Sequence, residues 1–308
     1  MKTRIFFLFL VLLLSAITSS KAIGQNQEKD QITKIVLLGT GTPFADPDRS
    51  GPCIAIVVNN TPYLVDIGPG VVRRASAAHK VGINGLAVSN LKHAFVTHLH
   101  SDHTVGYPDL IFSSWVLGRD EPLKVYGPKG IGDMTKHILA AYQQDIHMRI
   151  YGLEKANKQG YKVEAHEIEP GIVYKDSNVT VEAFQVNHGS WPQAFGYKFT
   201  TPDKKIVISG DTAPCESIVE MSMGCDVLIH EVYSRQGFER LSPVSQKYHS
   251  SFHTSSYELA EIATKTKPKL LILYHQLFFG GSTEDELLAE IRKKYSGNVV
   301  SGKDLEIY

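Results

Sequence analysis

Short apolar runs separated by turn signals fill the chain from residue 34 onward, and they predict strands interspersed with helices. The runs that predict strands are residues 34–38, 53–58, 63–66, 94–96, 123–126, 163–168, 179–186, 195–199, 205–209, 226–230, 269–274 and 298–308. Helical spacing predicts helices at 71–78, 132–142, 254–266 and 284–294. Strands with helices in both halves predict two sheets with helices outside them, a four-layer α/β arrangement. Because no linker separates the halves, we expect residues 25–308 to form one domain.

The first 24 residues carry the pattern of a secretion signal. Lys2 and Arg4 precede an apolar run over residues 5–17, and small and polar residues follow it. This pattern predicts a signal peptide, residues 1–24, that is removed before Gln25, and a periplasmic or secreted protein. The run is short for a bilayer span, so we expect no stable membrane insertion after removal. An uncleaved anchor is the alternative.

Composition and charge narrow the function classes only a little. Apolar residues make up 43% of the chain and charged residues 21%, which is typical of a soluble globular protein. The formal net charge is zero, and without residues 1–24 the chain has 29 basic and 32 acidic residues, so no overall basic field favours nucleic acid. Cys53, Cys215 and Cys225 allow at most one internal disulfide, Cys215 with Cys225, and three buried thiols are the alternative.

One short segment concentrates residues that bind metals. Residues 97–103 read Thr-His-Leu-His-Ser-Asp-His and directly follow a predicted buried strand. A loop at a strand end can turn His98 and His100 toward one point, and Asp102 and His103 toward a neighbouring point. Neutral imidazoles and a carboxylate are ligands that suit zinc. The segment therefore predicts a metal site.

The pattern His-x-His-x-Asp-His resembles the signature of the metallo-β-lactamase superfamily, whose fold is an α/β four-layer αβ/βα sandwich. His188, Asp211 and His275 each end a predicted strand and follow in the family's order. The resemblance implies two zinc ions, with manganese or iron as alternatives, and a carboxylate shared between them. The implied ligands are His98, His100, His188 and Asp211 for one metal, and Asp102, His103, Asp211 and His275 for the other.

Further features resemble the ribonuclease Z-like branch of this superfamily. They are residues 38–43, Leu-Gly-Thr-Gly-Thr-Pro; residues 65–68, Val-Asp-Ile-Gly; and the pairing of Ile-His-Glu at 229–231 with Phe-His-Thr-Ser at 252–255. The resemblance implies that His253 donates a proton to the leaving oxygen or holds the oxygens of the ester, and that Glu231 orients and charges it. With Asp102, these two are the implied catalytic residues.

Three other residues are candidates for supporting roles. We expect Asp66 and His230 to support the site by hydrogen bonds without contacting a metal. Trp191, three residues after His188, is a candidate wall of the substrate pocket, and core packing is its alternative role.

The chain departs from the tRNA-processing members in one place. Only 22 residues separate His188 from Asp211, and they hold a hairpin-like segment rather than the long basic arm that grips tRNA in those members. Together with export and the charge balance, this makes tRNA an unexpected partner and a small-molecule ester the expected substrate.

We therefore expect an exported dinuclear zinc hydrolase in which metal-bound hydroxide cleaves a small anionic ester. A resemblance to arylsulfatase-like members favours an aryl sulfate over a phosphodiester. The alternatives are a ribonuclease Z-like endoribonuclease or phosphodiesterase acting on RNA, and a binding module without metals. A homodimer is left open, because related enzymes are often dimers.

Overall fold

Two sheets take up the apolar runs in the computed structural model, which describes residues 32–308. The predicted signal peptide, residues 1–24, lies outside the described residues. The six-stranded sheet consists, in spatial order, of β1 (Thr33–Gly39), β2 (Cys53–Val58), β3 (Thr61–Val65), β4 (His93–Phe95), β5 (Leu123–Gly127) and β6 (Val163–Glu167). The seven-stranded sheet consists of β13 (Val299–Ser301), β12 (Leu270–Leu277), β11 (Val227–Tyr233), β10 (Lys205–Ile208), β9 (Phe195–Thr200), β8 (Thr180–Gln185) and β7 (Gly171–Lys175).

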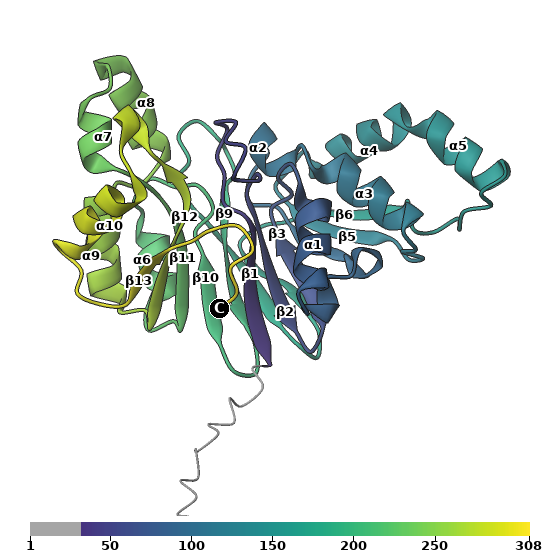
Figure 1. Cartoon of the computed structure of the whole chain (residues 1–308), viewed down its shortest axis with the longest axis horizontal. Helices are drawn as coiled ribbons and strands as arrows, with labels where there is room; N and C mark the ends of the chain where they lie inside the picture. The colour runs from purple at the N-terminus through teal and green to yellow at the C-terminus, as the bar shows by residue number, and fades with distance from the viewer. Residues whose placement is uncertain (1–31) are drawn as a thin grey trace, which may run out of the picture. The chain divides into compact units, whose positions relative to one another are not determined.

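Helices lie on the outer faces of the two sheets, at one edge of the sandwich and, in the case of α5, away from it (Figure 1). They are α1 (Val71–Lys80), α2 (Ser101–Thr104), α3 (Tyr107–Val116), α4 (Ile131–Ala141), α5 (Gln143–Tyr151), α6 (Glu216–Ser222), α7 (Arg235–Glu239), α8 (Pro243–Phe252), α9 (Ser256–Thr266) and α10 (Glu284–Arg292). Helices α1 and α3 pack with the six-stranded sheet, and α6, α9 and α10 pack with the seven-stranded sheet (Figure 1). The predicted four-layer αβ/βα sandwich is confirmed.

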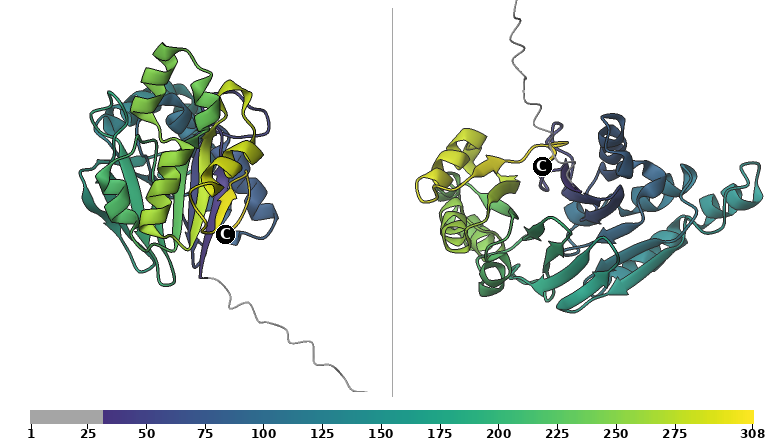
Figure 2. Two further views of the ribbon diagram at one scale, coloured as in Figure 1. Left: turned by 90° about the vertical axis from the view of Figure 1, so that its left-hand side faces the viewer. Right: turned by 90° about the horizontal axis from the view of Figure 1, so that it is seen from below.

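Burial on both faces explains the continuous apolar runs. In β1, Ile35 and Leu37 face the second sheet, whereas Val36 and Leu38 pack in the layer that contains α1 and α3. Successive side chains of a strand point to opposite faces, so a strand covered on both sides needs apolar residues at every position. Figure 2 shows the two sheets between the blue-to-teal helices and the green-to-yellow helices.

Parallel strand pairing gathers several strand ends at one edge of the sandwich. Strands β3, β4 and β5 are parallel, and so are β10, β11 and β12. Parallel strands end at the same edge of a sheet, where loops commonly carry functional residues. Helices α2 and α8, which adjoin the candidate residues, lie at this edge (Figure 1).

The predicted final strand, 298–308, is split in the structure. After β13 the chain crosses to the other sheet, where Tyr308 N donates to Ile35 O and Ile35 N donates to Tyr308 O, both at 2.9 Å. Gly302 lies at the crossing, and a Cβ there would stand 2.5 Å from Leu37 Cδ1. The last residues therefore join the two sheets.

Two sequence expectations concern thiols and membranes. All three cysteines are free thiols in the structure, Cys53 and Cys225 buried and Cys215 half-buried. None of the helices in residues 32–308 combines the length and the hydropathy that a membrane crossing requires.

Candidate metal centre

Three histidines converge on one point at the ends of β4 and β8. His98 and His100 lie in the loop after β4, and His188 lies three residues after β8. His98 Nε2 is 2.9 Å from His100 Nδ1, and His188 Nε2 is 3.1 Å from the same atom. Each residue therefore turns one ring nitrogen toward a common centre, which is the first of the two predicted metal positions.

A second group forms between α2 and β12. Asp102 Oδ2 lies 3.2 Å from His275 Nε2 and 3.4 Å from His103 Nε2. Asp211, in the loop after β10, places Oδ2 at 3.5 Å from His103 Nε2 and Oδ1 at 3.6 Å from His275 Nδ1. It also lies within reach of His98. Asp211 thus stands between the two groups, where a bridging ligand is expected.

The donor set fits divalent cations. His103 Nε2, Asp211 Oδ1 and His275 Nδ1 are buried and have no hydrogen-bond partner among residues 32–308. A buried polar atom without a partner costs about 1–3 kcal/mol, so such a cluster persists when a ligand satisfies it. Ligands of tetrahedral zinc lie about 3.3 Å apart at metal distances of about 2.0–2.1 Å. With His275 Nε2 as its donor atom, the separations of 2.9 to 3.5 Å within the two groups match this spacing.

The charges in the two groups also suit cations. Burial lowers the pKa of His98 well below its usual value and that of His188 to about 4, which favours the neutral imidazole that binds metal. Burial disfavours the charged form of His103 as well, but nearby carboxylates, Asp66 first among them, outweigh it and raise the pKa of His103 well above its usual value. The surroundings of His103 therefore stabilise positive charge.

Asp66 holds the metal-binding loop from the end of β3. Its Oδ1 accepts a hydrogen bond from Thr97 N at 2.8 Å, and its Oδ2 lies 2.8 Å from His103 Nδ1. This leaves His103 Nε2 free to face the centre. Both Asp66 and His275 have positive φ, 63° and 42°, a conformation that costs about 1–3 kcal/mol in a non-glycine residue and that clusters at functional sites.

His230 is placed differently from Asp66. It is fully buried, and its Nδ1 lies 2.6 Å from the main-chain oxygen of Glu231. In the described chain no hydrogen bond joins its ring to any of the seven proposed ligands.

Glu231 and His253 form a buried pair beside Asp211. His253 Nδ1 lies 3.3 Å from Glu231 Oε2 and 3.9 Å from Asp211 Oδ2, and Thr254 N donates to Glu231 Oε1 at 2.7 Å. Burial, with the charge of Asp211, raises the pKa of the Glu231 carboxyl well above its usual range, and burial lowers the pKa of His253 to about 4. His253 is also within reach of Asp211 and His275, so the geometry alone permits it as a ligand.

Two aromatic residues enclose the three-histidine group. Trp191 Nε1 lies 2.7 Å from His100 Nε2, and the two rings meet edge to face at 4.8 Å. Phe252, which belongs to the quoted 252–255 motif but received no role from the sequence, packs on His188 at 5.0 Å, and its main-chain oxygen lies 2.9 Å from His188 Nδ1. A contact made by a main-chain oxygen leaves no residue-type signal, and only the adjacency to His253 hints at it.

Two sheets with helices outside, and a histidine and carboxylate cluster at their strand ends, define the architecture of a metal-dependent hydrolase. Residues 61–276 match the family model of the Beta-lactamase superfamily domain. The chain is 30% identical over 276 residues to the Ribonuclease Z of Mycobacterium bovis strain BCG, covering 88% of this chain and 96% of that enzyme. The Ribonuclease Z of Mycobacterium tuberculosis strain H37Rv is 29% identical with the same coverage.

Solved structures agree on the fold. Human tRNase Z, short form, superposes with a TM-score of 0.65 at 20% identity, covering 89% of this chain and 98% of that one. The metallo-beta-lactamase fold protein YhfI from Bacillus subtilis gives 0.69 at 18% identity, covering 90% and 100%. The chain belongs to the metallo-β-lactamase superfamily, in its ribonuclease Z-like branch.

These relatives correct the expected substrate and partner. The sequence predicted a small-molecule ester as the substrate and made tRNA an unexpected partner. Both expectations conflict with the similarity of nearly the whole chain to enzymes named ribonuclease Z and tRNase Z. The relatives favour the alternative, an RNA-cleaving phosphodiesterase, and give no support to an aryl sulfate substrate. The charge argument failed because a net charge sums the whole chain and does not report one groove. The arm that this chain lacks would contact RNA and is not part of the hydrolytic centre. In its place, β9 and β10 occupy the segment between His188 and Asp211.

Proposed function

We propose that the protein is a metal-dependent endoribonuclease of the ribonuclease Z type, which hydrolyses a phosphodiester bond of tRNA or a tRNA-like RNA. The observation that carries the proposal is the convergence of all seven predicted ligands in a chain that aligns with 96% of a ribonuclease Z. Export of the enzyme remains a prediction from residues 1–24.

The residues that would hold the metals follow from the two groups. His98, His100 and His188 would hold one cation, Asp102, His103 and His275 would hold the other, and Asp211 would contact both. When bound, the cations would supply Lewis acidity toward water and toward the phosphate oxygens. The remaining chemistry belongs to the side chains around them.

His253 would serve the leaving oxygen. Its Nδ1 faces the buried Glu231 at 3.3 Å, so its Nε2 remains for the substrate. A hydrogen bond between Glu231 and this ring nitrogen would fix the tautomer and orientation of the ring, as a proton donor requires. Thr254 N fixes Glu231 in turn, by its hydrogen bond to Oε1 at 2.7 Å. Asp66 holds His103 through the opposite ring nitrogen, so the polar groups next to the metal ligands are themselves oriented.

The test is cleavage of labelled RNA by the purified, zinc-loaded protein. The substrates are a tRNA with a 3′ extension, an unstructured RNA of equal length, and bis-p-nitrophenyl phosphate, each with and without chelator. We expect chelator-sensitive cleavage near the 3′ end of the tRNA body. Two bound metals with no cleavage of either RNA would contradict the proposal, whether or not the small diester is hydrolysed.

A further inference from the structure

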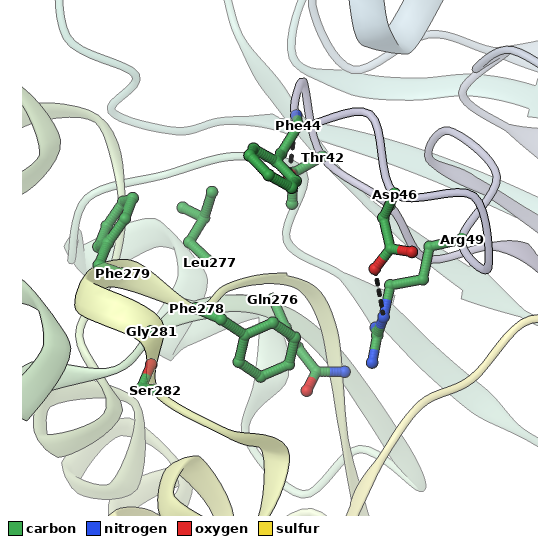
Figure 3. Close-up of a pocket in the computed structure, with 11 residues that line it drawn as sticks. Thr42, Phe44, Asp46, Arg49, Gln276, Leu277, Phe278, Phe279, Gly281 and Ser282 are labelled. Atoms are coloured by element: carbon green, nitrogen blue, oxygen red, sulfur yellow. Dashed lines mark hydrogen bonds and ion pairs between the residues drawn. The ribbon is translucent and has the colours of Figure 1, made fainter.

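A cavity of about 370 Å³ lies between the loop after β1 and the segment formed by the end of β12 and the residues that follow it (Figure 3). Its volume is in the range of about 300–1,000 Å³ that is typical of small-molecule sites. Gln276, in its wall, directly follows the proposed ligand His275. A second hollow shares Phe44 and Arg49 with this cavity and reaches Asp102. The cavity therefore adjoins the proposed metal centre.

The loop presents an aromatic ring to solvent at this cavity. Phe44 is 82% exposed, although it lines both hollows. The loop that carries it is anchored, because the Asp304 carboxylate accepts hydrogen bonds from Thr40 N and Ser50 N, both at 2.8 Å. The main-chain nitrogen of Phe44 donates to Thr42 Oγ1 at 3.3 Å. Phe44 therefore offers a free aromatic face at the rim of both hollows.

The rest of the lining supplies further aromatic surface and a polar edge. Phe278 and Phe279 are half-buried, and the Arg49 guanidinium lies 5.2 Å from the centre of the Phe278 ring. Ser282 also lines the cavity and is only 7% exposed, yet its Oγ has no hydrogen-bond partner within residues 32–308. A buried hydroxyl without a protein partner calls for another partner, such as water or a bound molecule.

Charge decides what kind of molecule fits. Arg49 lies 3.9 Å from Asp46 and 3.7 Å from Glu284, so two carboxylates offset its positive charge. A phosphate would meet the carboxylate of Asp46 in the same lining. A neutral, flat heterocycle with donors and acceptors on its edge matches aromatic faces bordered by a carboxylate, a guanidinium and a hydroxyl.

We propose that this cavity binds a nucleobase of the RNA strand next to the cleaved phosphodiester, with Phe44 as a stacking face. The proposal rests on the proposed function for its substrate. Stacking on aromatic side chains accepts any base, because every base has a π face, and the polar edge adds preference among bases. Phe44 then contributes to substrate binding rather than to the chemical step.

Fluorescence of 2-aminopurine riboside 5′-monophosphate tests the cavity without using activity, because stacking quenches this base. The full chain is titrated with and without zinc. The variants are Phe44→Ala, Phe44→Trp as the rescue, and Leu153→Ala as a control on a fully exposed residue beyond α5. We expect saturable quenching that weakens about tenfold in Phe44→Ala, returns in Phe44→Trp and is unchanged in Leu153→Ala. Purine riboside should displace the probe, and ribose 5-phosphate should not.

Equal quenching in wild type and Phe44→Ala, or equal displacement by ribose 5-phosphate, would overturn the nucleobase site. In a parallel RNA cleavage assay, Phe44→Ala should raise KM and leave kcat close to that of wild type. RNA cleavage with an unchanged KM in Phe44→Ala would also overturn it, while leaving the proposed function intact. Quenching that depends on Phe44 in a protein that cleaves no RNA would retain the site and reject the proposed function.

Discussion

Two carboxylates in polar clusters, Asp176 and Asp211, differ in how fully their oxygens are bonded. Asp176 Oδ2 accepts hydrogen bonds from the hydroxyls of Tyr63 at 2.6 Å and Tyr174 at 2.9 Å, and its Oδ1 accepts from two main-chain nitrogens at 2.8 Å. Asp211 Oδ1 has no hydrogen-bond partner in the described chain and instead faces His275 Nδ1 at 3.6 Å.

This difference distinguishes a carboxylate that stabilises the fold, Asp176, from one that is available to bind a cation, Asp211. A carboxylate whose lone pairs are all bonded stabilises its own loop and has no room for a cation. A buried carboxylate left open among imidazoles is destabilising unless a cation joins it. Substitution of Asp211 should therefore affect metal content and activity, and substitution of Asp176 should affect stability alone.

Asp211→Ala is expected to have the largest effect, because Asp211 lies between both metal positions. Metal content should fall below the proposed two ions per chain, and RNA cleavage should drop by roughly a thousandfold or more. Elemental analysis of the purified protein and single-turnover cleavage measure the two quantities. Full activity with two metals bound would remove the distinction between the two carboxylates.

His253→Ala tests whether His253, which pairs with Glu231, acts as a proton donor or belongs to the metal ligands around Asp211. We expect both metals to remain and cleavage to slow by about a hundredfold, the lower end for loss of a general acid. An RNA in which sulfur replaces the bridging leaving oxygen, so that the leaving thiolate needs no proton, should lose much less. His147→Ala is the matched control, since this exposed histidine of α5 lies outside the metal cluster and outside the cavity. Loss of zinc in His253→Ala would make His253 a ligand.

Asp66→Asn tests how much the orientation of His103 contributes to metal binding. The amide keeps the shape but loses the charge that stabilises the His103 hydrogen bond at 2.8 Å. Metal affinity or activity should fall by about tenfold, the lower end for such supporting residues. Zinc titration against a chelating indicator measures the affinity. An unchanged affinity together with unchanged activity would show that Thr97 and the loop backbone suffice to orient His103.

The sequence predicted the layers, and it named the histidines and aspartates that the structure brings together, because both have residue-type signals. Strands buried on both faces are uninterrupted apolar runs, as in β2, and the ligands are histidines and aspartates at strand ends. The hairpin-like segment between His188 and Asp211 was also confirmed, as β9 and β10.

The elements that were missed have weak patterns or depend on distant partners. Strand β7 alternates exposed and half-buried residues at a sheet edge, and α8 has no buried residue, so neither shows a strong apolar period. The split at Gly302 depends on a close approach to Leu37, far away in the sequence. The cavity beside Phe44 joins residues near 44 and near 280, which no local pattern could connect.

Asp176→Asn should change stability and leave activity within about twofold of wild type, because the residue lies outside the metal cluster. Burial alone would raise the pKa of Asp176, but the hydrogen bonds from Tyr63 and the loop outweigh it and lower that pKa. A lowered pKa stabilises the fold above the unfolded value of about 3.9, and this stabilisation is lost as pH falls through the folded value. Urea unfolding at pH 7 should show that the free energy of unfolding falls by about 1–3 kcal/mol, with the difference from wild type shrinking below about pH 4.

Glu164→Gln, on an exposed carboxylate of β6, is the control and should change neither stability nor activity. Lost zinc in Asp176→Asn would show that full hydrogen bonding does not mark a carboxylate as structural, and the contrast with Asp211 would fail.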